Sequence, residues 1–142
     1  MPIQWRKQMS VGNLIIDLDH RYLLCLINMV ETAMLHPEDG VSLSETLAQL
    51  AEYAREHFDR EERIQYRIRY QYYMEHKKHH QRLLARLDEI SAAILDEKDP
   101  EQLKGRGDEI MVLLREWLLD HVLKEDMKMK KDLEISPPNL MG

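Results

Sequence analysis

The chain has 142 residues, a formal net charge of −6 and an apolar fraction of 44%, which fits one small domain with its own core. The acidic balance gives no electrostatic support for nucleic acid or an anionic membrane as a partner. Apolar runs stay well short of a membrane span and the first ten residues are too polar for a signal peptide, so we expect a soluble cytoplasmic protein without membrane contact.

The first two predicted elements are an N-terminal arm and a helix. The arm covers about residues 1–16. The helix begins near Asp17 or Asp19, since acidic residues favour helix N-termini, and it runs to about Leu35. Cys25 lies within this helix. As the lone cysteine it excludes an internal disulfide and a thiolate metal cluster, and we expect it to be a small buried apolar residue.

Ser42 and Glu45 have the spacing of a capping box, which predicts the start of a second helix that continues to about Arg67. A short turn then leads into a third helix over about residues 72–95. Four tyrosines surround this turn, and we interpret them as packing of the turn against the helices rather than as a redox relay. They are Tyr66, Tyr70, Tyr72 and Tyr73.

The fourth segment opens at Asp99, which a proline follows, a pair typical of an N-cap and the first helical residue. Gly105 and Gly107 are expected to interrupt the segment, so that its main helix covers about residues 108–131. The tail over residues 135–142 contains two prolines and is expected to be frayed.

Apolar residues recur at alternating steps of three and four in all four segments, which is typical of helices that pack with a 3.5-residue period. Short connections favour antiparallel neighbours. We therefore predict an all-α protein, an antiparallel up-down-up-down four-helix bundle over about residues 17–131. The arm precedes this bundle in a single domain that spans residues 1–142.

Five histidines and two carboxylates fall within these apolar seams rather than on polar faces. Residues four apart share a helix face, so His57 with Glu61 and His76 with His80 each present a pair of ligands. The helix ends that carry the ligands meet at one level of an antiparallel bundle, so the side chains converge. Seven ligands exceed the needs of one tetrahedral zinc and suit two metal ions. The predicted set is His20, His57, Glu61, His76, His80, His121 and Asp126.

Burial of so many polar groups without a metal is costly, because each desolvated group needs a partner. A buried ion network that holds no metal is therefore the less favoured alternative. Two other histidines are expected to be ordinary surface residues. His36 lies in the turn after the first helix, and His79 faces about 100° away from His80.

The last ligand is ambiguous in an ideal helix. Glu125 lies four residues after His121 and shares its face, whereas Asp126 lies five residues after it and about 140° round the helix. A π-type turn, which is frequent at functional sites, would bring Asp126 to the ligand face. We choose Asp126 and keep Glu125 as the alternative.

The strings at residues 57–62 (HFDREE) and 117–122 (WLLDHV) resemble the HFxxEE and WLxxHI patterns of the hemerythrin family. The resemblance extends from Trp5 to Asp126 and includes HxxxH at residues 76–80. It implies a non-haem, oxygen-bridged pair of iron ions as the cofactor. By this resemblance, one iron is held by His76, His80 and His121, the other by His20 and His57, and both are bridged by Glu61 and Asp126.

The sequence departs from the family pattern at Arg69, which stands in the turn after the second helix where glycine is frequent. A backbone with positive φ at this position would strain an arginine. Val122 stands where isoleucine is commoner. We expect an apolar oxygen pocket beside the metals, with Leu118 as its gate. The pocket is expected to consist of Phe58, Trp117, Leu118 and Val122.

The resemblance implies reversible binding of dioxygen, in an oxygen carrier, store or delivery protein rather than an enzyme. The donor set agrees, because the chain lacks the Glu-x-x-His motif of carboxylate-rich di-iron oxygenases. The metal held by only two histidines keeps an open position. The alternatives are an oxygen or redox sensor or an iron store that acts through a partner, and a di-iron peroxidase or nitric oxide reductase-like enzyme with an unidentified electron donor.

Overall fold

The computed structural model describes residues 2–36 and 42–142, apart from the side chains of Leu118 and Leu119. Four long helices and no strand make up this described part of the chain. The helices are α1 (Leu14–Leu35), α2 (Leu43–Arg67), α3 (Tyr73–Asp96) and α4 (Pro100–Glu116). The last of them continues into a π-helical segment, η3 (Trp117–Glu125), a short 3-10 segment, η4 (Asp126–Met129), and α5 (Lys130–Glu134).

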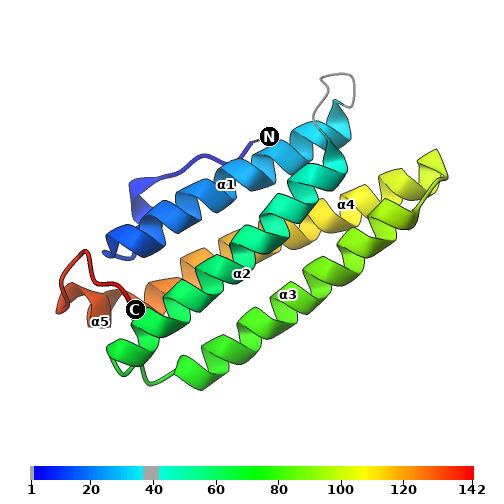
Figure 1. Ribbon diagram of the computed structural model, residues 1–142. Helices are drawn as coiled ribbons and strands as arrows, with labels where there is room; N and C mark the ends of the chain where they lie inside the picture. Colours follow the sequence, from blue (N-terminus) through cyan, green and yellow to red (C-terminus); the bar gives the residue numbers. More distant parts are fainter. Residues whose placement is uncertain (1, 37–41) are drawn as a thin grey trace.

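The four long helices run alternately in opposite directions and pack as a bundle (Figure 1). Each helix contacts the next along the chain, and α1 also contacts α4. The prediction of an all-α, antiparallel four-helix bundle is confirmed. None of the helices within residues 2–36 and 42–142 is long and apolar enough to cross a membrane.

Helix α1 begins earlier than predicted because Asn13, rather than an aspartate, caps it. The Asn13 side chain accepts a hydrogen bond from the Ile16 backbone N at 3.0 Å. Asp17 instead faces the arm and accepts a hydrogen bond from Ser10 Oγ at 2.5 Å. The caps predicted for α2 and α4 are confirmed. Ser42 Oγ accepts from Glu45 N at 3.3 Å, and Asp99 Oδ1 accepts from Glu101 N at 3.2 Å.

The predicted interruption of the fourth helix is wrong. Gly105 and Gly107 both lie inside α4, which is continuous from Pro100. Gly107 is buried, and a Cβ atom at this position would collide with the side chain of Met34 on α1. This glycine therefore permits a close approach of two helices and does not end one.

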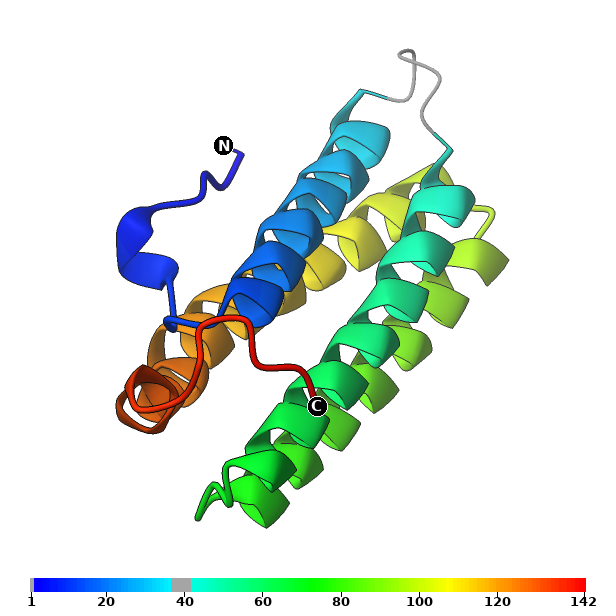
Figure 2. The ribbon, with the colours of Figure 1, turned by 60° about the vertical axis from the view of Figure 1, so that its left-hand side comes forward.

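The two terminal segments both pack against α1 (Figure 2). In the arm, the backbone N and O of Ile3 bond with the Asn28 side chain at 3.0 and 2.9 Å. The tail, which was predicted to be frayed, reaches the start of α1. There Leu14 N donates to Pro138 O at 2.7 Å, and Asn13 Nδ2 donates to Leu140 O at 3.1 Å.

Cys25 is exposed, so the prediction that it is buried is wrong. It lies on the outward face of α1, which also carries Leu18 and Met29 with exposed fractions of 59% and 42%. The exposure of Cys25 follows from its position on the outward face of the helix and not from the apolar character of its side chain.

Arg69 has a left-handed backbone with φ of 55°. This is the strained conformation that was considered for Arg69, because glycine is frequent at this position in the family. We expect Arg69→Gly to raise the free energy of unfolding by about 1 kcal/mol, because glycine adopts this φ without a Cβ clash. Urea denaturation measures the change. As a control, Lys78→Gly inside α3 should lower the free energy of unfolding by about 1 kcal/mol. An Arg69→Gly variant less stable than the parent would contradict the interpretation.

Candidate metal centre

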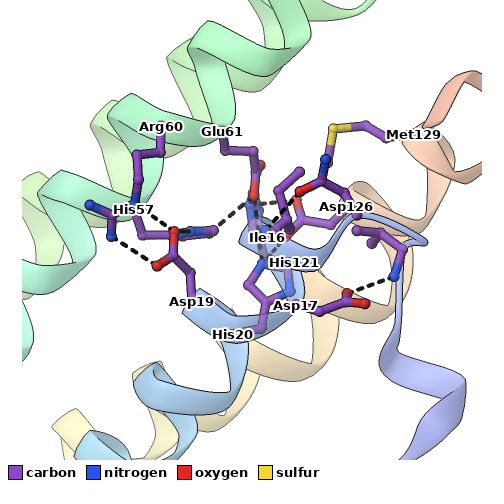
Figure 3. Close-up of polar contacts among 12 residues, drawn as sticks. Ile16, Asp17, Asp19, His20, His57, Arg60, Glu61, His121, Asp126 and Met129 are labelled. Carbon is purple, nitrogen blue, oxygen red and sulfur yellow. Dashed lines mark hydrogen bonds and ion pairs between the residues drawn. The ribbon is translucent and has the colours of Figure 1, made fainter. Parts of the chain in front are cut away.

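The seven predicted ligands come from all four helices of the bundle and meet in its core. Each is at most 4% exposed. Figure 3 shows His20, His57, Glu61, His121 and Asp126 turned toward one another. Their elements are α1 for His20, α2 for His57 and Glu61, α3 for His76 and His80, η3 for His121 and η4 for Asp126.

The seven side chains form two groups that share both carboxylates. Within each group, one possible ligand atom per residue lies within 4.8 Å of all the others. The first group contains His76, His80, His121, Glu61 and Asp126. The second contains His20, His57, Glu61 and Asp126.

Glu61 presents one carboxylate oxygen to each group. Its Oε1 lies 2.9 Å from His76 Nε2, and its Oε2 lies 3.0 Å from His57 Nε2. The spacing of His57 and Glu61 on α2 places both on one face of the helix, as predicted. A carboxylate whose two oxygens face different groups of histidines can bind two cations at once.

Asp126, and not Glu125, completes both groups. Asp126 Oδ1 lies 2.8 Å from His121 Nε2, and Oδ2 lies 2.9 Å from His20 Nε2. The π-helical turn of η3 is wider than an α-turn, so it carries Asp126 to the face of His121. Glu125 is only half-buried and lies 3.4 Å from Lys128 Nζ.

Most atoms that face the space between the two groups have no hydrogen-bond partner among the described residues. They are both oxygens of Glu61 and of Asp126, and Nε2 of His20, His57 and His76. Buried polar atoms without hydrogen bonds are costly, and imidazole nitrogens and carboxylate oxygens are good ligands for divalent transition metals. The cluster therefore fits a metal site.

The pKa values of the cluster show how the metal-free chain balances its charges. Burial lowers the pKa of His20 and of His76, but the carboxylates of Asp126 and Glu61 close to their Nε2 atoms outweigh it and raise both to about 10. Burial raises the pKa of both carboxyl groups, but the surrounding imidazoles hold them well below their usual range. Burial lowers the pKa of His121 too, but the same two carboxylates outweigh it and raise that pKa, so protonated imidazoles balance the buried carboxylates at neutral pH.

Asp19 supports the cluster from outside, a role that the sequence reasoning missed (Figure 3). Its Oδ2 lies 3.0 Å from His57 Nδ1 and accepts from Arg60 Nε at 2.8 Å, while its Oδ1 accepts from Tyr53 Oη at 2.6 Å. Burial raises the pKa of Asp19, but these hydrogen bonds hold it well below its usual range. An ionised Asp19 fixes the His57 ring with Nδ1 protonated, which leaves Nε2 for a metal. Its partners lie on another helix, so no periodic pattern reveals them.

Asp19→Asn removes this negative charge and keeps the size of the side chain. We expect it to weaken metal binding at the group of His20 and His57 by about 10- to 100-fold, the usual effect of losing such a partner. Chelator competition measures the affinity of each metal. Asp17→Asn is the matched control, since Asp17 bonds to the arm. Equal affinities in the two variants would contradict a supporting role for Asp19.

Two of the four predicted pocket residues, Phe58 and Trp117, pack beside the cluster. The Phe58 ring stacks on His80 with 3.9 Å between ring centroids, and Trp117 packs edge-on against Phe58 at 5.7 Å. Val122 is buried. The side chain of Leu118 lies outside the described residues, so its role as a gate stays a prediction.

His79 is not the ordinary surface residue that was predicted. It is half-buried, and its ring stacks on that of His121 with 5.0 Å between centroids and an angle of 13°. Burial lowers the pKa of His79, and the neighbouring imidazole of His121 adds to this effect. His79 belongs to neither group of possible ligands. His36 is exposed, as predicted.

Comparison with known proteins gives a consistent result. A bacteriohemerythrin of Pseudomonas paraeruginosa is 28% identical over 122 residues, which cover 86% of this chain and 75% of the relative. A hemerythrin-like protein of Naegleria gruberi is 25% identical over 129 residues, which cover 91% of this chain and 92% of the relative. Residues 11–133 match the family described as the hemerythrin HHE cation binding domain. Because this match spans most of the sequence, the chain belongs to the hemerythrin family.

Proposed function

We propose that this protein binds dioxygen reversibly, as a cytoplasmic carrier, store or delivery protein, at a pair of iron ions in the cluster. One observation carries the proposal. Glu61 and Asp126 each present one carboxylate oxygen to the first group of histidines and the other oxygen to the second group. Within the proposal, Glu61 and Asp126 bridge the ions. One ion is held by His76, His80 and His121, and the other by His20 and His57.

The unequal histidine count sets where dioxygen binds. The group of His20 and His57 offers one histidine fewer than the other group, so an ion held there would keep a position open to dioxygen. When bound, the iron pair supplies the electrons that hold dioxygen. The chain's own contribution is to fix the ligands, through Asp19 at His57, and to exclude water with the aromatic rings of Phe58 and Trp117.

Oxygen titration of the reduced, iron-loaded protein tests this function. A visible absorption band should appear as dioxygen is added, saturate at one dioxygen per chain, and disappear when argon removes the gas, through repeated cycles. Oxidation in a single step that argon does not reverse would contradict reversible binding. Turnover of hydrogen peroxide or nitric oxide with a reductant, without an oxygenated form, would favour the enzyme alternative.

A further inference from the structure

A hollow of about 910 Å³ lies at the turn between α2 and α3, within the size range of small-molecule sites. It is separate from the cluster of proposed metal ligands. Cationic and aromatic side chains dominate its lining. They are Arg63, Arg67, Arg69, Lys77, Tyr66 and Tyr73. Two acidic residues, Asp59 and Glu62, also line the hollow, and Asp59 pairs with Arg63 at 2.5 Å.

The cations of this hollow are only partly balanced. Within the described residues, neither Arg69 nor Lys77 pairs with a carboxylate, and Lys77 Nζ lies over the Tyr73 ring, 5.8 Å from its centroid. Arg67 donates to the neutral carbonyl oxygen of Met141 at 2.7 Å. The hollow therefore favours an anion.

The tyrosines give the same hollow an aromatic wall. The side chain of Tyr66 is 74% exposed, and its ring lies 5.8 Å from that of Tyr73 at an angle of 64°. An exposed ring of this kind offers a flat face on which a planar ligand can stack. The adjacent cations then select a planar ligand that also carries a phosphate or another anionic group.

Two residues of the hollow reach the metal cluster directly. Tyr70 is buried, and its ring lies 6.2 Å from the ring of His76. Glu62 Oε2 lies 3.3 Å from His80 Nδ1. A molecule in the hollow is thus one side chain away from two of the proposed iron ligands, a distance that suits electron transfer.

We propose that the hollow binds a reduced flavin mononucleotide, which restores the iron(II) form of the centre. Its phosphate pairs with Arg69 and Lys77, and its ring system stacks on Tyr66. A flavin can release its electrons one at a time, as metal ions accept them. This inference rests on the proposed function, because an iron pair that has lost its electrons no longer binds dioxygen.

The electron balance closes without another reactant. Dihydroflavin loses two electrons and two protons and becomes flavin. The two electrons convert two iron(III) ions into two iron(II) ions, and the protons leave to solvent through the open hollow.

Fluorescence titration of oxidised flavin mononucleotide with the iron-loaded, oxidised protein tests the site. Binding should quench flavin fluorescence saturably, riboflavin should bind at least tenfold more weakly, and inorganic phosphate should displace the nucleotide. The double variant Arg69→Gly with Lys77→Gln should weaken binding at least tenfold. Lys104→Gln, an exposed lysine on α4, is the control and should bind as the parent does. Equal binding of riboflavin, no saturable quenching, or an unaffected double variant would overturn the proposal.

Anaerobic reduction of the same oxidised protein by photoreduced flavin mononucleotide tests the electron transfer. The bleaching of its visible absorption should slow at least tenfold in the double variant and not in Lys104→Gln. An unchanged rate would overturn the proposal. Nucleotide binding without reversible oxygen binding would refute only the proposed function, whereas reversible oxygen binding without nucleotide binding would refute only the flavin site.

Discussion

Glu61→Gln is expected to reduce the metal content from the proposed two ions per chain to less than one. Glu61 gives one oxygen to each group of histidines, at 2.9 Å from His76 and 3.0 Å from His57, so its loss affects both ions. Glutamine keeps the volume of the side chain, but its amide cannot offer two anionic oxygens. Elemental analysis after iron loading and desalting measures the content.

Two further variants separate metal loss from unfolding. Glu61→Ala should also lower the free energy of unfolding of the metal-free chain by about 3–5 kcal/mol, because it leaves the protonated imidazoles of His20 and His76 with Asp126 as their single buried carboxylate. Glu52→Ala, an exposed glutamate on the same helix, should change neither property. If Glu61→Gln retained two ions per chain, a bridging role for Glu61 would be wrong.

Iron(II) uptake is expected to release at least about two protons per chain and to strengthen at least about a hundredfold per pH unit between about pH 6 and 8. His20 and His76 have pKa values of about 10 in the metal-free protein, so both are protonated in this range. Each must lose its proton to bind a metal. Anaerobic titration with a pH indicator counts the protons, and chelator competition gives the affinities. Uptake without proton release would contradict the ion pairs of the metal-free cluster.

The same pKa values determine the stability of the chelator-treated protein. The raised pKa values of His20 and His76 contribute stability that is fully present below the ordinary histidine value of 6.5 and is lost as the pH rises toward about 10. The lowered pKa values of Glu61 and Asp126 contribute stability above the ordinary carboxyl range, and this is lost in acid. Urea denaturation should therefore show greatest stability between about pH 5 and 6.5, and bound iron should remove the loss at alkaline pH.

The sequence predicted the parts of the structure that repeat along a helix. The steps of three and four residues indicated the bundle, and the spacings of His57 with Glu61 and of His76 with His80 placed each pair on one face. The capping box at Ser42 marked a true helix start, because its hydrogen bond is local.

Features that depend on contacts between distant segments were missed. Asp19 bonds to residues of another helix, Gly107 allows close packing against Met34, and the tail bonds to the start of α1. Local patterns carry no record of such contacts, so they could be found only in the folded chain. By contrast, the choice of Asp126 over Glu125 rested on an expected π-type turn, and the structure has π-helical geometry in η3.

Anomalous X-ray diffraction from crystals of the iron-loaded protein, recorded at the iron absorption edge, tests the central claim most directly. Two iron peaks per chain should appear, one beside His76, His80 and His121 and one beside His20 and His57, with Glu61 and Asp126 in contact with both. A single peak, peaks away from the two carboxylates, or a signal only at the zinc edge would contradict a shared di-iron centre.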